Sequence, residues 1–152
     1  MASTTFSGPV TSTNGFVGNI TGNVTGTTAI GVVTHTPVAI NATATATAAQ
    51  VATGYITSTS ALATTITLPT GTLLGAALSA VQGTILNLYI DNTAGASTVT
   101  IAVATNGILS AAAAAGSGAG AGLLTVPSGV TGQGRFTLMF SSATAYTFTR
   151  TA

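Results

Sequence analysis

The sequence predicts an all-β fold: a β-sandwich or jelly-roll-like domain over residues 31–152, preceded by an extended arm rich in Gly, Thr and Asn over residues 1–30. Three observations favour this fold. Apolar and polar residues alternate with a period of two in several short runs, which is typical of strands with one buried face. Turn-forming Gly, Pro, Asn and Ser residues separate these runs. Apolar residues make up 46% of the chain, which is enough for a chain to fold.

The arm differs from the rest of the chain in composition. The unit Gly-Asn-(Ile/Val)-Thr occurs twice in tandem over residues 18–25, and bulky apolar residues are sparse. A segment so rich in glycine cannot offset by itself the conformational entropy that it loses on ordering. We therefore expect the arm to pack on another surface. The candidate contact residues are its apolar side chains, Phe6, Phe16, Ile20, Val24 and Ile30.

From Gly31 onward most of the chain follows the two-residue period of strands. The intervening positions are mostly Thr, Ala or Asn, with Tyr89 and Met139 as exceptions. Ala and Thr also alternate over residues 42–48, which indicates a further strand. The residues expected to share buried faces are Leu62, Thr64, Ile66 and Leu68; Leu86, Leu88 and Ile90; Val99, Ile101 and Val103; Phe136, Leu138 and Phe140; Tyr146 and Phe148.

One segment has a helical spacing instead. Apolar residues recur at i, i+1, i+4, i+5 and i+8 from Leu73 to Val81. This spacing predicts one to three helical turns across an end of the sandwich, begun by Thr72 and ended by Gly83. Gly75 within it is unfavourable to a helix. Residues 111–122, which are almost entirely Ala and Gly, predict a long loop.

Ionisable side chains are few: one Asp, two Arg, one His and three Tyr, with no Lys, Glu or Cys. Acid–base catalysis needs at least two positioned groups, and a metal site needs several converging ligands. We therefore expect no enzymatic activity, no metal and no cofactor. His35, within a run that alternates, is expected to be a hydrogen-bonded histidine at a surface or interface.

The remaining charges stand at predicted strand ends or turns. Either Asp91, Arg135 and Arg150 are solvated singly, or an arginine pairs with Asp91 within one chain or between chains. Two arginines are too few for phosphate contacts, so we expect no nucleic-acid partner. No apolar run reaches the roughly 18 residues of a spanning helix, so we expect no membrane partner. The absence of cysteine and of a secretory signal predicts synthesis in a cytoplasm.

Several short motifs resemble those of virion proteins. Residues 6–16 and the tandem units that follow look like the N-terminal segments of structural proteins of tailed bacteriophages. Residues 86–92, residues 97–102, the Asn106-Gly107 pair and the last strand over 146–150 are similar, in that order, to phage head-decoration (cement) domains. The resemblance implies a trimeric, β-rich knob on the surface of a capsid, made in the host cytoplasm, with no catalytic residues. The Ala- and Gly-rich segment departs from the pattern of these domains.

The leading hypothesis is a homotrimeric decoration protein that binds the major capsid protein and stabilises the shell, with the arm contacting the shell or a neighbouring subunit. One alternative is a tail-fibre or adhesin module, in which the tandem Gly-Asn-(Ile/Val)-Thr units form a shaft. Another is an ice-binding protein that presents rows of Thr-x-Thr pairs. Such pairs recur in the chain, but at irregular spacing, whereas a repetitive lattice needs a constant period.

Overall fold

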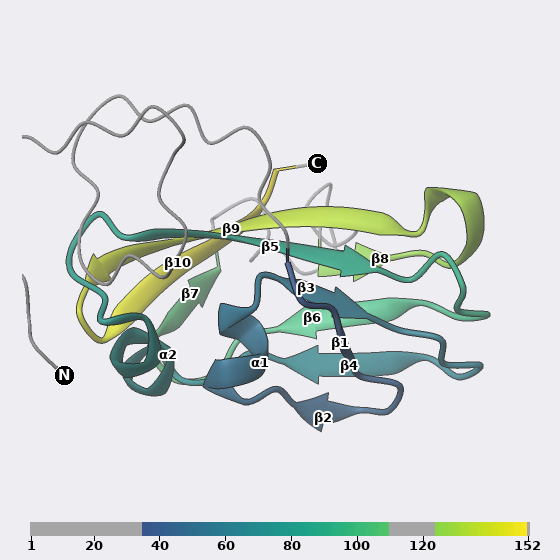
Figure 1. Ribbon diagram of the computed structural model, residues 1–152, viewed down its shortest axis with the longest axis horizontal. Coiled ribbons are helices and arrows are strands. Elements are labelled where there is room, and N and C mark those ends of the chain that lie inside the picture. Colours follow the sequence, from purple (N-terminus) through teal and green to yellow (C-terminus); the bar gives the residue numbers. More distant parts are fainter. Residues whose placement is uncertain (1–34, 110–123, 152) are drawn as a thin grey trace, which may run out of the picture. The chain divides into compact units, whose positions relative to one another are not determined.

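The computed structural model describes residues 35–109 and 124–151. The chain divides into two units, Met1–Val33 and Thr34–Ala152, and every described residue belongs to the second. The described part is mostly strand with two short α-helices (Figure 1), which confirms a β-rich fold. Outside the described residues lie the expected arm, the loop over 111–122 and the candidate contacts Phe6, Phe16, Ile20, Val24 and Ile30.

The strands form two mixed sheets. Sheet A has the order β1-β3-β5-β9-β10-β7, and sheet B has the order β2-β4-β6-β8. The strands of sheet A are β1 (Val38–Ala39), β3 (Tyr55–Thr57), β5 (Ile85–Asp91), β7 (Gly107–Leu109), β9 (Gln133–Ser142) and β10 (Ala145–Arg150). Those of sheet B are β2 (Ala44–Thr45), β4 (Thr64–Thr67), β6 (Val99–Ala102) and β8 (Thr125–Val126).

The first six strands alternate between the two sheets. As a result, β1, β3 and β5 are parallel neighbours in sheet A, and β2, β4 and β6 are parallel neighbours in sheet B. Of the later strands, β9 is antiparallel to both β5 and β10, β8 is antiparallel to β6, and β7 is parallel to β10. The two mixed sheets establish the β-rich class, whereas the sandwich or jelly-roll form stays a prediction.

Buried residues of both sheets belong to one core. Four aromatic side chains of β9 and β10 lie in it, with the rings of Phe136 and Phe148 stacked at 5.0 Å and those of Phe140 and Tyr146 tilted at 5.7 Å. The Tyr146 hydroxyl donates to the Pro69 carbonyl oxygen at 3.0 Å, and burial raises the pKa of Tyr146 to about 12. The inward-facing residues expected on β5, β9 and β10 are thus confirmed. The other large core residues are Ile56, Ile66, Leu68, Leu74, Leu88, Ile90, Ile101 and Leu138.

Two local expectations are wrong. Leu62 precedes β4 instead of belonging to it, and its side chain is 77% exposed. The alternating Ala and Thr residues form a strand only at β2, because Thr47 begins helix α1 (Ala48–Ala52). The Gln50 N–H donates to the Thr47 hydroxyl at 3.2 Å, and the Thr47 N–H donates to the Gln50 side-chain oxygen at 2.8 Å. This capping box fixes a helix start that the two-residue period conceals.

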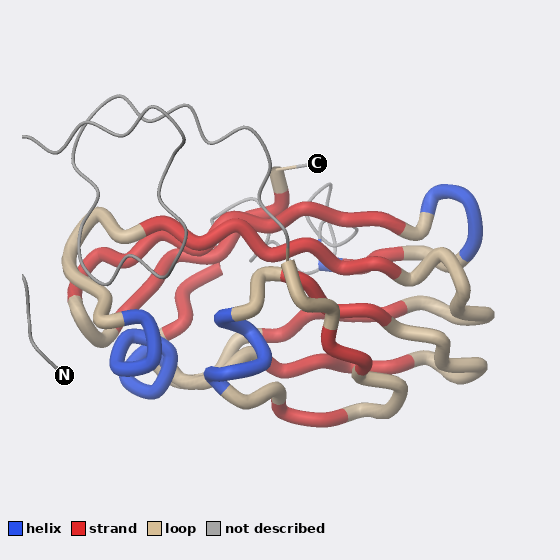
Figure 2. The backbone as a smooth tube through the Cα atoms, viewed as in Figure 1, coloured by secondary structure: helices blue, strands red, loops and turns tan. Residues whose placement is uncertain are grey.

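The helix expected from the leucine spacing is α2 (Gly71–Leu78), with bounds that differ from the expected ones. Thr70 caps it rather than Thr72, since the Thr70 hydroxyl accepts from the Leu73 N–H at 3.3 Å. It ends at Ser79, whose φ of 49° is left-handed, rather than at Gly83. Figure 2 shows α1 and α2 next to each other, to the left of the strands of sheet B.

Glycine at two positions lets α2 lie against the turn between β9 and β10. A Cβ at Gly75 would overlap the Ala143 carbonyl oxygen, and one at Gly71 would overlap the Thr144 carbonyl oxygen. The close approach explains why Gly75 occupies the interior of a helix, where glycine costs about 1 kcal/mol relative to alanine.

We expect Gly75→Ala to destabilise the protein, although alanine is the better helix former by about 1 kcal/mol. The added methyl group meets backbone that cannot rotate away, and overpacking of this kind costs about 1–3 kcal/mol. The matched control is Ala76→Gly on the exposed side of the same helix, which should cost about 1 kcal/mol through propensity alone. Urea unfolding measures both. A Gly75→Ala variant more stable than the wild type would contradict the packing described.

Candidate binding face

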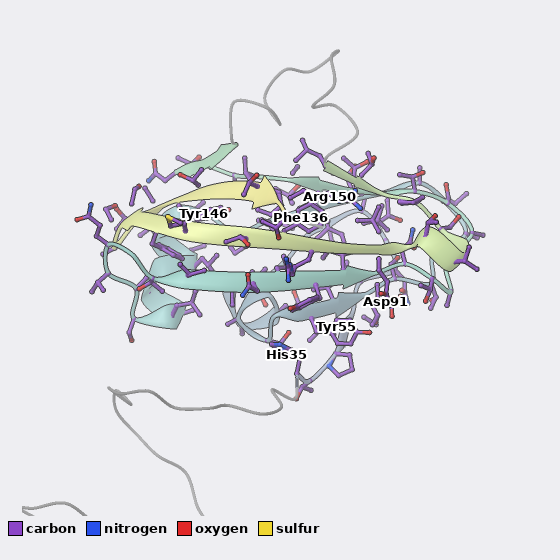
Figure 3. All side chains as sticks on the ribbon, turned by 90° about the horizontal axis from the view of Figure 1, so that it is seen from above. His35, Tyr55, Asp91, Phe136, Tyr146 and Arg150 are labelled. Carbon is purple, nitrogen blue, oxygen red and sulfur yellow. The ribbon has the colours of Figure 1, made fainter. Side chains whose placement is uncertain are left out.

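Most of the ionisable side chains gather at one surface. Of the seven in the chain, Tyr146 lies in the core and Arg150 lies at the end of β10. The other five lie on or beside the outer face of sheet A, the side opposite the core. We call them the polar cluster: His35, Tyr55, Tyr89, Asp91 and Arg135. Figure 3 shows His35, Tyr55 and Asp91 near one another.

The strand register arranges this face in rows that cross β3, β5 and β9. Residues directly opposite each other in a sheet point to the same side. They alternate along each strand with the buried residues, such as Leu88 and Ile90, that point into the core. Two of these rows contain members of the polar cluster. The first row is Tyr55, Tyr89 and Arg135, and the second is Thr57, Asp91 and Gln133.

Tyr89 lies at the centre of the polar cluster, with 38% of its surface exposed. The His35 ring lies beside it, with 5.8 Å between the ring centroids. The Nδ1 of His35 donates to the Thr53 carbonyl oxygen at 2.7 Å, which is the hydrogen bond expected of this histidine. Gly54 makes room for the imidazole, because a Cβ there would lie 2.8 Å from two of its ring atoms, and the φ of Gly54 is +74°.

Asp91 is held in place by its neighbours. Its carboxylate accepts from the Thr93 hydroxyl at 2.6 Å, from the Thr93 N–H at 3.0 Å and from the Tyr55 hydroxyl at 2.8 Å. The bonds from Thr93, followed by that from Tyr55, hold the pKa of Asp91 below its ordinary value, so the group is ionised at neutral pH. The same bond to Asp91 raises the pKa of Tyr55.

The two arginines have different surroundings. Arg150 donates to the Thr125 carbonyl oxygen at 2.6 Å and lies 5.8 Å from the centre of the Phe136 ring. Arg135 is exposed, and its Nε donates to the Thr151 hydroxyl at 3.2 Å. In the described part of the chain, Asp91 receives its hydrogen bonds from Tyr55 and Thr93 rather than from an arginine. A pair between chains stays a prediction.

The outer face of sheet A becomes apolar toward the beginning of β5. Ile85 and Met139 lie directly opposite each other and are 57% and 50% exposed. Between them and the polar cluster lies the pair Asn87 and Thr137, in which the Thr137 hydroxyl donates to the Asn87 side-chain oxygen at 3.1 Å. We call Ile85 and Met139 the apolar end. The face therefore runs from an apolar end to a charged end within one pair of strands.

The described residues include no group of three or more His, Cys, Asp or Glu side chains that could hold a metal ion. Within those residues no helix is long and apolar enough to cross a membrane. What the outer face of sheet A offers is a half-exposed aromatic ring, an ionised carboxylate, a guanidinium group and two exposed apolar side chains. These groups suit binding to another surface.

Three members of the polar cluster, His35, Asp91 and Arg135, are candidate residues from the sequence, which does not predict that they lie close together. Tyr55 and Tyr89 are not among those candidates. One feature of the sequence points to this face: Tyr89 and Met139 are large side chains at outward positions, which are otherwise mostly small or polar. This feature marks β5 and β9, although it does not show that the two strands are neighbours.

No family model, no curated protein and no solved structure matches this chain. The function is therefore inferred from the residues of the chain itself.

We expect Asp91→Asn to remove an acid-dependent part of the stability. Because the folded pKa is lowered from an unfolded value of about 3.9, the carboxylate stabilises the fold above that pH. This contribution is lost as the pH falls through the folded pKa. The stability difference between the wild type and Asp91→Asn should therefore shrink as the pH falls from about 5 to about 2. Urea unfolding across this range measures it.

The control for Asp91→Asn is Thr93→Ala, which keeps the carboxylate and removes the hydroxyl donor. Without the hydroxyl donor, the pKa of Asp91 in the folded state should be lowered less. The stabilisation by the carboxylate should then be smaller than in the wild type, and it should be lost at a higher pH. A stability difference between wild type and Asp91→Asn that stays constant across the range would contradict the lowered pKa.

Proposed function

We propose that the protein is a capsid decoration (cement) protein of a tailed bacteriophage, which binds the major capsid protein and stabilises the shell as a homotrimer. The virion assignment rests on the resemblance of the short motifs. The observation that carries binding to another protein is the outer face of sheet A. Tyr, Arg and Met are enriched in protein interfaces. On this face Tyr89 and Arg135 are direct neighbours, and Met139 lies two rows away, toward the beginning of β5.

The near absence of charge supports a structural role on a shell. Charged side chains make up 2% of the chain, and its formal net charge is +1. Such a surface has little electrostatic protection against association. Assembly on a lattice of protein subunits would remove apolar and hydroxyl-bearing surface from water. In this proposal the knob is a β-sandwich or jelly roll, and the arm over 1–30 contacts the shell through its apolar residues.

A tail-fibre or adhesin module is a second candidate. The observation in its favour is that β1, β3 and β5, like β2, β4 and β6, stack as parallel neighbours while the chain passes between the sheets. Chains that wind in this way can be extended by further turns, as a fibre requires. Electron microscopy of the particle separates the two candidates by location.

Ice binding is a third candidate, supported by threonines on the outer side of sheet B. The register aligns Thr45 with Thr67, and Thr65 with Thr100 and Thr125, although their spacing along the sequence is irregular. Absence of thermal hysteresis in the purified protein would remove this candidate.

Truncation of residues 1–30 tests the decoration proposal. We expect the truncated chain to keep a cooperative melting transition, because buried residues of both sheets, from Ile40 to Phe148, form one core cluster. It should no longer attach to shells purified from the virus that encodes it. The full-length chain is the control. Loss of the melting transition would show that these residues belong to the core, and unchanged attachment would show that they do not anchor the protein.

Shell binding should depend little on salt. Charge-steered association weakens as the Debye length contracts from about 10 Å at 0.1 M to about 3 Å at 1 M, whereas apolar burial does not depend on this screening. We therefore expect a less than tenfold change in affinity between about 0.05 and 1 M NaCl. Occupancy on purified shells measures it. A larger loss, above about 1.4 kcal/mol, would mean that the few charges dominate binding.

A further inference from the structure

We propose that two copies of the chain pack against each other through the outer faces of sheet A. The copies are related by a two-fold axis in the interface, which runs parallel to β5 and β9 and passes over the line midway between them. This contact between two copies is separate from the three-fold contacts of the proposed trimer, and it goes beyond attachment to a shell. In a two-fold interface each contact occurs twice. If a first residue of one copy contacts a second residue of the other copy, then the second residue of the first copy also contacts the first residue of the other.

The axis position follows from the register of β5 and β9. A rotation about a line between these strands brings β5 of one copy over β9 of the other, at the same height along the strands. Every pair that is opposite within the sheet is then also a pair between copies. The four pairs, with β5 given first, are Ile85 and Met139, Asn87 and Thr137, Tyr89 and Arg135, Asp91 and Gln133.

Each of these pairs is chemically favourable across the interface. Ile85 meets Met139 of the partner subunit, which removes two half-exposed apolar side chains from water. Tyr89 meets Arg135 of the partner subunit, and a guanidinium group over a tyrosine ring is an attractive contact. Among the described residues no partner is found for the side-chain amide donors of Asn87 and Gln133, which face the hydroxyl of the partner subunit's Thr137 and the carboxylate of the partner subunit's Asp91.

The charges favour a second copy as the occupant. Asp91 and Arg135 are the charged residues on this face among the described positions, and they are of opposite sign. Within a chain, the Arg135 side chain has a hydrogen bond at Nε, and none is found at its terminal nitrogens among the described residues. Placed over Tyr89, Arg135 of the partner subunit lies one row from Asp91. The interface thus presents the ion pair between chains that the sequence allows.

Other relative orientations are less favourable. A two-fold axis across the strands would put the apolar end, Ile85 and Met139, onto the row of Asp91 and Gln133. That arrangement would bury a carboxylate against apolar side chains, which is costly. The axis parallel to the strands keeps like chemistry together, and aligned sheets that pack face to face are a common arrangement in proteins.

Disulfide trapping tests this contact, because the chain contains no cysteine. Ile85→Cys and Met139→Cys are prepared as separate full-length proteins and mixed under mild oxidation. We expect a cross-linked dimer to form at least tenfold faster in the mixture than in either variant alone. The control mixture is Leu62→Cys with Val130→Cys, which are 77% and 101% exposed and lie outside sheet A. Equal rates in the two mixtures would overturn the proposal.

Sedimentation of the full-length protein without shells gives an independent test. Arg135→Glu should weaken self-association at least tenfold, and the charge-swapped variant Arg135→Glu with Asp91→Arg should restore part of it. Melting curves check that each variant is folded. A wild-type chain that stays monomeric up to its solubility limit overturns the proposal, as does self-association that Arg135→Glu leaves unchanged.

Shell binding separates this inference from the proposed function. The chain truncated by residues 1–30, which the decoration proposal expects to lose attachment, should keep pairing in solution, because the paired residues lie on β5 and β9. If the wild type is monomeric and Arg135→Glu loses attachment, the face docks on the shell and the two-fold pair is wrong. If the wild type pairs but does not attach to shells, the decoration proposal fails while the pair stands.

Discussion

The fold depends on burying large apolar side chains of both sheets in one core, in a chain that has almost no charge to solvate its surface. The β9–β10 hairpin supplies the four aromatic rings of this core, with Phe136 stacked on Phe148 and Phe140 beside Tyr146. Burial of each ring removes a large apolar area from water and stabilises the folded state. The hairpin also contacts helix α2 and the segment between β4 and α2, since α2 packs on its turn and the Tyr146 hydroxyl donates to the Pro69 carbonyl oxygen.

The binding face follows from the same constraint. With the large side chains directed inward, the outward positions of sheet A are mostly small or polar, and the exceptions concentrate on β5 and β9. Asp91 has three donors nearby and is fixed in orientation, whereas the terminal nitrogens of Arg135 keep their hydrogen-bonding capacity in the described part of the chain. The face therefore combines a fixed acceptor, Asp91, one row along β5 from Tyr89, with an adaptable donor, Arg135, directly opposite Tyr89 on β9.

The sequence predicted best where the two-residue period coincided with bulky residues. In β5, β9 and β10 alternation was enough to identify the buried face, because only that face could fill the core. It predicted less where short-range hydrogen bonds compete with the period, as in the capping box of Thr47 and Gln50 and in the cap at Thr70. The polar cluster was beyond prediction, since the pairing of Tyr55, Tyr89 and Arg135 is set by tertiary topology between strands far apart in the sequence.

Self-complementarity of the outer face is a direct result of antiparallel pairing. Across a two-fold axis between two antiparallel strands, each residue meets the residue that is already its neighbour within the sheet. Cross-strand neighbours are selected to be compatible, since aromatic, apolar and hydrogen-bonding pairs stabilise a sheet. The pairs Ile85 with Met139 and Tyr89 with Arg135 are therefore favourable both within one chain and between two. A chain that is 2% charged can in this way obtain a specific contact between copies from one arginine, one aspartate and one tyrosine.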